Sequence, residues 1–269
     1  MASDFRVEEY NQMHLLVTND DGISAPGLLA LADELRKNYP VTVLAPDRNW
    51  SASGHVKTMH RPLRVKEVLL EDGTLALASD GAPSDCVTLA MLGLIEEEIN
   101  LVVSGINPNA NLGHDVTYSG TVTAAMEASI WGIPGIAVSL DSPENHLGDL
   151  DYGPAAQVAA EVVNQVIKHQ LNSKTVLNVN VPYLPIEDIR GYQITRQGLR
   201  VYRDRLDRRF DPRGKAYYWI GGDTPTGVRE EGTDIGSLAN GFVSITPLKL
   251  DLTATEMLHE LREWNWDEH

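Results

Sequence analysis

Two neighbouring aspartates, Asp20 and Asp21, directly follow an apolar stretch in the segment Thr18-Asn19-Asp20-Asp21-Gly22. Adjacent carboxylates repel each other unless a cation neutralises them, so the pair is a candidate for a divalent metal site. The same segment is also good turn chemistry, because Asn, Asp and Gly favour tight turns. The pair alone therefore leaves a metal site and a solvated turn both open.

Three further segments carry oxygen-bearing side chains where a strand is expected to end or a helix to begin: residues 45–54, 103–113 and 118–121. The candidates they supply are Asn49, Ser51, Asn107, Asn111, Ser119, Gly120 and Thr121. Amide and hydroxyl oxygens are ligands for hard cations, and the free N–H groups at a helix start bind anions. Taken singly, each segment is also explained as a surface loop or a helix cap.

The elements that must position these residues alternate between short apolar stretches and helical patterns. We expect strands at 14–18, 41–45, 75–78, 101–103, 135–140 and 176–181, and helices at 27–37, 83–95, 121–131 and 154–169. This alternation predicts an α/β fold with a doubly wound, mostly parallel, Rossmann-like sheet that is complete at the strand 176–181. Ligands of such sheets bind beyond the carboxyl ends of the strands, where the four segments are expected to meet.

Beyond Pro182 the sequence consists of polar segments punctuated by Pro and Gly, which predicts an extended β-hairpin arm. We expect one structural domain with three parts: an α/β metal-phosphatase core at 1–185, a hairpin extension and oligomerisation arm at 186–248, and a C-terminal helix within 249–269, at 252–266. A hairpin of this size has little core of its own. We therefore expect a homodimer or homotetramer whose subunits cover or exchange the arm.

Composition and charge limit the partners. The chain has 22 Lys and Arg against 38 Asp and Glu, a net charge of −16, which argues against specific binding of a long nucleic acid. No apolar run approaches the roughly 18 residues that a membrane span needs, so no membrane partner is expected. Cys86 stands in an apolar run and is expected to be a buried small side chain, and residues 1–12 do not resemble a signal peptide. These features favour a cytoplasmic location.

The four segments together resemble the SurE family of survival-protein nucleotidases. The resemblance rests on ordered blocks around Asn19-Asp20-Asp21-Gly22, Ala45-Pro46-Asp47-Arg48-Asn49-x-Ser51, Val102-Val103-Ser104-Gly105-Ile106-Asn107 and Tyr118-Ser119-Gly120-Thr121. It is strong from about residue 13 to residue 141 and looser in the hairpins. It implies a divalent-metal-dependent 5'-nucleotidase, which hydrolyses nucleoside monophosphates to nucleoside and phosphate. Additional 3'-nucleotidase and exopolyphosphatase activities stay open.

The resemblance also implies roles for particular residues. One divalent cation, Mg²⁺ or Mn²⁺, is expected on Asp20, Asp21, Ser51 and Asn107, and three of these, Asp20, Asp21 and Asn107, are expected to be catalytic. Substrate and phosphate binding is expected from Asn49, Asn111, Ser119, Gly120 and Thr121. The proposed metal ligands all offer hard oxygen, which favours magnesium or manganese over zinc. Water is the expected nucleophile with Asp20 as base, while direct attack by Asp20 on phosphorus stays open.

Two positions depart from the pattern of the family. Asn109 stands where relatives commonly have a glycine, at a point where the backbone is expected to need a positive φ, which asparagine tolerates better than most residues. His114 stands where an acidic residue is common, and we expect it on the surface. Trp50, Tyr118 and His55 are candidates for stacking on a purine, although each is also explained as a core or surface residue. His55 has no partner visible in the sequence and is expected to be incidental.

Arginine is concentrated in the expected arm. The stretch from 196 to 213 holds only three aspartates against seven arginines, namely Arg196, Arg200, Arg203, Arg205, Arg208, Arg209 and Arg213. Guanidinium groups bind phosphate, so they could contact the distal phosphates of a polyphosphate or the active site of the next subunit. The alternative is that they pair with an acidic surface of a partner subunit.

Other function classes fit the sequence less well. A metal-dependent deacetylase also places paired aspartates after a first strand, but it needs a later His-x-x-His, which the eight histidines do not form. A phosphatase of the haloacid-dehalogenase type needs Asp-x-Asp after the first strand, which is absent. The non-enzymatic alternative is a nucleotide- or metal-binding regulatory module that keeps the site without turnover.

Overall fold

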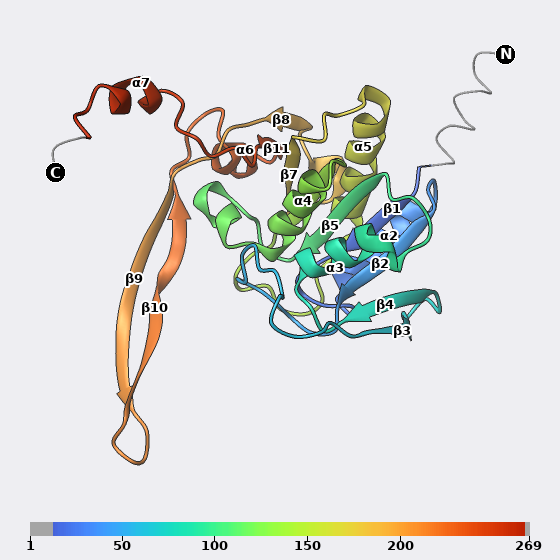
Figure 1. The fold of residues 1–269 in the computed structure, drawn as a ribbon, viewed down its shortest axis with the longest axis horizontal. Helices are drawn as coiled ribbons and strands as arrows, with labels where there is room; N and C mark the ends of the chain where they lie inside the picture. The colour runs from blue at the N-terminus through green and yellow to red at the C-terminus, as the bar shows by residue number, and fades with distance from the viewer. Residues whose placement is uncertain (1–12, 267–269) are drawn as a thin grey trace.

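The structure, a computed structural model, describes residues 13–266, so the N-terminal stretch 1–12 lies outside the described residues. In this part of the chain nine strands form one sheet in the order β3-β4-β2-β1-β5-β6-β7-β11-β8, and two more strands form a separate hairpin (Figure 1). The strands are β1 Leu15–Thr18, β2 Val41–Pro46, β3 Val65–Leu69, β4 Leu75–Ser79, β5 Leu101–Asn107, β6 Gly135–Asp141, β7 Val176–Pro182, β8 Tyr192–Ile194, β9 Arg200–Phe210, β10 Ala216–Gly227 and β11 Val243–Leu248. The α-helices are α2 Pro26–Arg36, α3 Pro83–Leu89, α4 Gly120–Ile130, α5 Gly153–His169, α6 Asp234–Ala239 and α7 Met257–Arg262. Three short helices complete the description: the π-helix η1 Ala90–Leu94 and the 3₁₀ helices η2 Gly113–Thr117 and η3 Ile186–Asp188.

The centre of the sheet is parallel. β1 pairs in parallel with β2 on one side and β5 on the other, and β6 and β7 continue the sheet beyond β5 in the same direction. The chain leaves β1 for β2 on one side and later enters β5 on the other, so the topology reverses between β1 and β5. Such a switch point is where open α/β sheets bind their ligands. The predicted doubly wound, mostly parallel α/β fold is confirmed.

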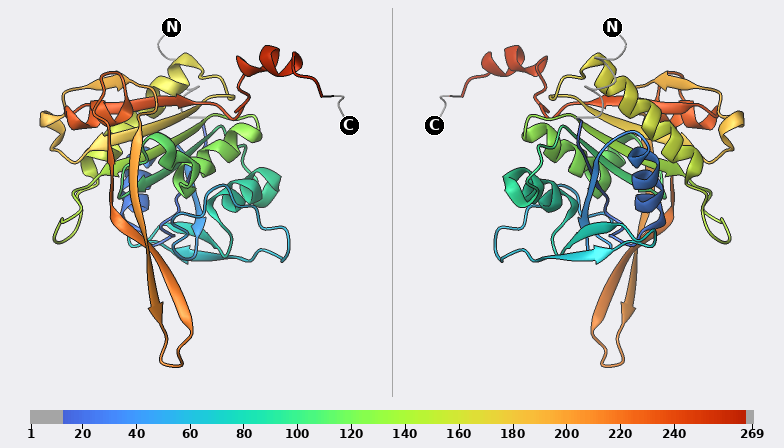
Figure 2. Two further views of the ribbon diagram at one scale, coloured as in Figure 1. Left: turned by 90° about the vertical axis from the view of Figure 1, so that its left-hand side faces the viewer. Right: turned by 90° about the vertical axis from the view of Figure 1, so that its right-hand side faces the viewer.

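Helices cover both faces of the sheet, with α2 and α5 on one face and α3 and α4 on the other (Figure 2). Leu15 and Val17 pack on the α2–α5 side, whereas Leu16 packs on the α3–α4 side, because successive side chains of a strand point to opposite faces. A Cβ on Gly135 would lie 2.2 Å from the carbonyl oxygen of Ala125. Only glycine therefore lets α4 pack directly on the backbone of β6.

The sheet is larger than the sequence predicts. β11 pairs antiparallel with β7, and β8 pairs with β11, so the sheet continues beyond the strand 176–181 where it was expected to be complete. β3, which pairs antiparallel with β4 at the other edge, was not predicted either. Both edge pairings are long-range or antiparallel, and the helix–strand alternation that identified the parallel strands says nothing about them.

Two predicted helices are shorter in the structure. In place of the helix expected at 83–95, the α-helix α3 ends at Leu89 and the π-helix η1 follows it. Gly93, within η1, has a φ of +98°, which ends the helical segment. The helix expected at 252–266 spans only Met257–Arg262. In addition α6, which follows the arm, was missed because six residues carry too little periodicity to be recognised.

The arm is the antiparallel hairpin of β9 and β10, which projects from the body of the molecule (Figure 1). Within residues 13–266 these two strands pair only with each other. Large apolar side chains such as Leu206, Trp219 and Ile220 are exposed along it. The predicted extended hairpin is therefore confirmed, and its covering by a second subunit stays a prediction.

Two expectations from composition concern the described residues. Cys86 is fully buried at the α3–sheet contact, and burial raises the pKa of its thiol, so it is a small core residue as predicted. None of the helices between residues 13 and 266 combines the length and the apolar character required to cross a bilayer.

Candidate active site

The loop after β1 is closed by its own side chains. Asn19 is fully buried, its side-chain oxygen accepts from the amide of Gly22, and its side-chain nitrogen donates to the carbonyl of Gly22, each at 3.1 Å. Gly22 has a φ of +105°, a conformation that favours glycine and turns the chain after the two aspartates. Asp20 and Asp21 are thereby held at the carboxyl end of β1, at the switch point of the sheet.

Asp20 lies between this loop and the start of α4. It is 3% exposed, and its carboxylate accepts a hydrogen bond from the Thr121 hydroxyl at 2.5 Å. A Cβ on Gly120 would come within 2.7 Å of the Asp20 Cβ, so a glycine is needed for this close approach. Burial raises the pKa of Asp20, against the hydrogen bonds from the Thr121 side chain and from backbone amides that include those of Gly120 and Thr121. A desolvated carboxylate thus faces the helix N-terminus.

Asp21 is the more accessible of the two carboxylates. Asn49 donates to its Oδ1 at 3.4 Å, whereas its Oδ2 is buried with no hydrogen-bond partner among the described residues. Burial and, secondly, the charge of Asp20 raise the pKa of Asp21 to about 7. An unpaired, desolvated carboxylate oxygen beside a second carboxylate is unfavourable, and a cation shared by the two groups relieves this.

The segment after β2 is fastened to the first loop. The amide of Trp50 donates to the carbonyl of Asp20 at 2.7 Å, and the side-chain oxygen of Asn49 accepts from the amide of Ser51 at 2.7 Å. Ser51 is exposed, so its hydroxyl is accessible at this position. The structure therefore brings the predicted residues Asn49 and Ser51 next to the two aspartates.

The start of α4 is a capped helix end. The Ser119 side chain accepts from the amide of Val122 at 3.1 Å, so this serine is the N-cap. The amides at the first helical positions have no partner within the helix and carry the positive end of its dipole. Gly120 and Thr121 are buried beside Asp20, so the helix start that was predicted to bind an anion and the carboxylates belong to one site.

Asn107 is the last residue of β5, the strand next to β1, where Thr18 and Ser104 lie opposite each other. Its side-chain nitrogen donates to the carbonyl of Asn109, and its side-chain oxygen takes no part in that hydrogen bond. Asn107 is thus placed at the same edge as the aspartates. The expectation that Asn109 needs a positive φ is wrong, because among the described non-glycine residues only Ala52 and Gln170 have one.

Asn111 is buried among polar side chains of β6 and β7. Its side-chain nitrogen donates to the Ser139 hydroxyl at 2.8 Å, and its backbone amide donates to the Asn180 side chain at 2.8 Å. Asn178 and Asn180 both donate to the Asn111 carbonyl, at 2.8 and 3.1 Å. The sequence analysis missed these supports, although asparagines two apart in an otherwise apolar strand must share one face. They fix the backbone of the predicted phosphate residue.

The sequence profile of the family described as "Survival protein SurE" matches residues 15–204. The chain belongs to the SurE family. The matched residues include all four segments of the site and most of the main sheet. The resemblance predicted from the motifs is therefore confirmed.

Individual SurE proteins are similar over nearly their whole length. The 5'-nucleotidase SurE of Chloroflexus aggregans is 50% identical over 256 residues, which span 95% of this chain and 100% of the relative. The 5'-nucleotidase SurE of Herpetosiphon aurantiacus is also 50% identical, over 95% of this chain and 99% of the relative. The crystal structure of the SurE protein from Aquifex aeolicus matches with a TM-score of 0.80 at 42% identity and covers 93% of this chain and 98% of that one. The fold is that of SurE proteins.

The remaining candidates in this SurE chain have different surroundings. His55 is not incidental, because its Nε2 lies 2.8 Å from the carboxylate of Glu127, a buried residue of α4. His114 is exposed, as predicted. Tyr118 is 63% exposed next to the N-terminus of α4, whereas Trp50 is half-buried. Of the three stacking candidates, Tyr118 is thus the most accessible.

Some arm arginines pair within their own chain. Arg196 lies 2.6 Å from Glu230, and Arg209 lies 2.7 Å from Asp207. Both pairs are well exposed, and exposed pairs contribute little to stability, at most about 1 kcal/mol. These contacts leave both interpretations of the arginine-rich stretch open.

Proposed function

We propose that this SurE-family chain is a divalent-metal-dependent phosphomonoesterase that hydrolyses nucleoside 5'-monophosphates to nucleoside and phosphate. The observation that carries the proposal is the position of two neighbouring, desolvated carboxylates, Asp20 and Asp21, against the N-terminus of α4. The curated relatives named 5'-nucleotidase support the same reaction and substrate class.

The residues at this edge of the sheet fit one Mg²⁺ or Mn²⁺ ion. Asp21 Oδ2 is buried without a partner in the described part of the chain, and burial raises the pKa of both aspartates, so a cation would relieve their repulsion. We assign Asp20, Asp21, Ser51 and Asn107 as its ligands, all of them oxygen donors of the kind that these ions prefer. When bound, such an ion polarises a phosphoryl oxygen and acidifies water.

The chain's own residues supply the remaining chemistry. The turn of Ser119, Gly120 and Thr121 lies beside Asp20 at the N-terminus of α4, and the positive end of a helix dipole stabilises the charge that develops on phosphate oxygens. We assign Asp20 as the base that removes a proton from the attacking water, with attack by Asp20 itself as the alternative. Asn49 orients Asp21 through its hydrogen bond, and Asn111 contributes to phosphate binding.

A phosphate-release assay tests the proposal. With adenosine 5'-monophosphate and Mn²⁺ the protein is expected to release phosphate, and chelation is expected to lower the rate at least about a hundredfold, with recovery on adding Mn²⁺. A panel that includes 3'-monophosphates and short polyphosphates measures the side activities. Turnover that persists in chelator contradicts the metal-dependent mechanism. Tight Mn²⁺ binding without turnover of any substrate in the panel identifies a regulatory module instead.

We also propose that the arginines of the arm contact long phosphate substrates. Arg208 lies over the rings of Phe210 and Tyr218 on the exposed hairpin, with its guanidinium carbon 5.0 and 5.8 Å from the two ring centroids. Replacing Arg208 and Arg209 by alanine is expected to lower the preference for longer polyphosphate about threefold or more, because each lost guanidinium removes a charge-assisted contact. Activity on a monophosphate and the oligomer mass measured by light scattering should not change. Dissociation into monomers would instead favour ion pairing with a partner subunit.

A further inference from the structure

One short stretch connects two parts of the phosphate site. Residues 111–121 run from Asn111 through η2 to the N-terminus of α4, so η2 sets the spacing between them. The amide of Tyr118 donates to the carbonyl of Asp115 at 2.9 Å, which ties the end of η2 to its first turn. A displacement of η2 therefore moves the start of α4.

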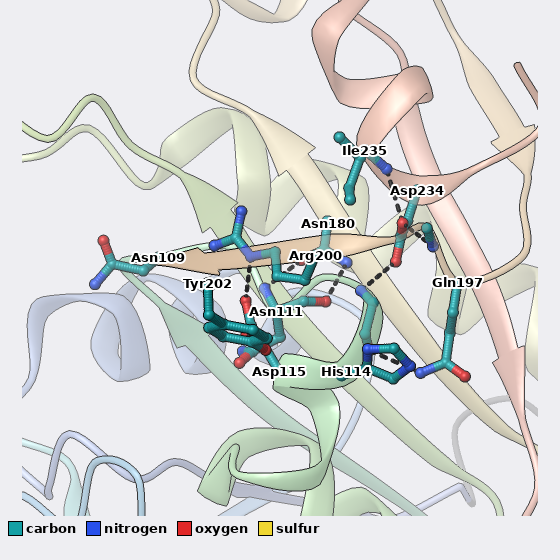
Figure 3. A network of polar contacts seen from close by, with 12 residues as sticks. Asn109, Asn111, His114, Asp115, Asn180, Gln197, Arg200, Tyr202, Asp234 and Ile235 are labelled. Atoms are coloured by element: carbon teal, nitrogen blue, oxygen red, sulfur yellow. Dashed lines mark hydrogen bonds and ion pairs between the residues drawn. The ribbon is translucent and has the colours of Figure 1, made fainter. Parts of the chain in front are cut away.

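The main sheet fixes the Asn111 end of this stretch, through Ser139, Asn178 and Asn180. Within η2 the support from the sheet is apolar, because Val116 is buried in a cluster with Ala137 of β6 and Val176 of β7. The polar contacts of η2 to distant residues come instead from the chain on either side of the arm (Figure 3).

Asp115 in η2 is held by two residues at the root of β9. Arg200 Nε donates to one carboxylate oxygen at 2.6 Å, and the Tyr202 hydroxyl donates to the other at 2.5 Å (Figure 3). The side chains of Asp115 and Arg200 are only 20% and 18% exposed, so this is a partly desolvated pair and not a loose surface contact. Burial and the bond to Asp115 raise the pKa of Tyr202 to about 12, so it stays a donor at neutral pH.

The first residue of η2 is bound from the same side. The amide of Gly113 donates to Asp234 at 2.8 Å, and the carbonyl of Gly113 accepts from Gln197 at 2.7 Å. Asp234 also accepts from the amide of Gly198 at 2.7 Å. A Cβ on Gly113 would lie 2.4 Å from the Gly198 carbonyl oxygen, so the two backbones are in direct contact. The root of the arm and η2 therefore form one rigid polar unit.

We propose that Asp115 is a positioning residue for phosphate binding, which with Arg200 and Tyr202 uses the root of the arm to hold η2, and so the N-terminus of α4, in place. The inference rests on the proposed function and extends it, because it makes the arm part of the phosphate site of its own chain. The start of α4 binds phosphate both in the ground state and in the transition state. Loss of the contacts of Asp115 with Arg200 and Tyr202 therefore weakens the binding of both states equally. Such a loss raises KM and leaves kcat nearly unchanged.

The variant Asp115→Asn keeps the size of the side chain and removes its charge. The KM for adenosine 5'-monophosphate and the Kd for inorganic phosphate, measured by calorimetry with Mn²⁺ present, are both expected to rise about tenfold, with kcat within about threefold. The Mn²⁺ concentration for half-maximal activity should stay within about twofold, because none of the assigned metal ligands lies in η2 or is bonded to Asp115. A general loss of structure would move all of these together.

Two further variants complete the test. Tyr202→Phe removes one donor only and should raise the phosphate Kd about threefold, which keeps the inference testable if Asp115→Asn does not fold. Glu230→Gln is the matched control, because it breaks the exposed 2.6 Å pair with Arg196 near the arm without touching η2. The inference is overturned if Asp115→Asn keeps KM and the phosphate Kd within about twofold of wild type. If that variant does not fold, the same result in Tyr202→Phe overturns it. Absence of turnover in the wild type contradicts the proposed function instead, and the phosphate Kd still tests the positioning role of Asp115.

Discussion

Replacing Asp21 by asparagine is expected to lower kcat/KM for a nucleoside monophosphate by about a thousandfold or more, because the site loses a metal-binding charge without losing volume. The same variant should be more stable than the wild type in chelator at pH 8. Burial raises the pKa of Asp21 to about 7, so at pH 8 the wild-type chain holds an ionised, desolvated Asp21 beside the buried Asp20, and an amide removes that cost. Partial exposure of Asp21 limits the gain to roughly 1 to 2 kcal/mol.

Metal-dependent melting curves separate these effects. The wild type should gain thermal stability on adding Mn²⁺, since binding to the folded state stabilises it, and Asp21→Asn should lose most of that gain. Glu144→Gln is the control, because Glu144 is an exposed carboxylate in the loop after β6 and is not assigned to the site. An Asp21→Asn protein that retains both wild-type activity and the Mn²⁺-induced shift would remove Asp21 from the metal site.

The parallel part of the fold could be predicted from the sequence because its strands are buried on both faces. Stretches such as 15–17 and 101–103 are apolar at every position and alternate with helices, which is the pattern of a doubly wound sheet. β11 and β8 could not be predicted in the same way, because β11 follows the arm and β8, which precedes the arm, joins the sheet only through β11. Their pairing depends on long-range contacts that no local pattern encodes.

The residues of the candidate site also differ in whether local sequence patterns could predict them. Asp20, Asp21 and Ser119 were predicted because strand ends and helix starts are local features, and the structure places them together at the switch point. Asp115 and Asp234 were not, since Asp115 lies 85 positions from Arg200 and Asp234 lies 121 positions from Gly113 along the chain. Sequence reasoning found the groups that do chemistry and missed those that hold them.

Glu127 shows the same limit, and its removal is expected to have the largest effect on stability. It is 2% exposed in an otherwise apolar part of α4 and makes contacts to four side chains. Its carboxylate accepts from Thr88 at 2.7 Å and Trp131 at 3.1 Å, and it pairs with His55 at 2.8 Å and Lys57 at 3.3 Å. Because His55 and Lys57 belong to the loop that carries Ser51, this carboxylate fastens that loop to the helix whose start faces Asp20.

Glu127→Gln is therefore expected to lower the free energy of unfolding by roughly 2 to 3 kcal/mol at pH 7. Burial alone would raise the pKa of Glu127, but hydrogen bonds from His55 and Thr88 and the charge of Lys57 lower it to about 2. A lowered pKa means that the ionised form stabilises the fold above its ordinary value of 4.5, and that this contribution is lost as the pH falls toward 2. The difference in unfolding free energy between wild type and variant should shrink over that range.

Denaturant unfolding at a series of pH values measures this difference. Glu34→Gln is the matched control, because within residues 13–266 Glu34 pairs only with Lys37, whose side chain is 63% exposed, one helical turn away, and its loss should change stability by less than about 0.5 kcal/mol at any pH. A gap between Glu127→Gln and wild type that stays constant from pH 7 to pH 3 would mean that the charge of Glu127 does not contribute. In that case the loop would be fastened by its other hydrogen bonds, such as those that Thr58 donates to Asp85, and not by the ion pairs of Glu127.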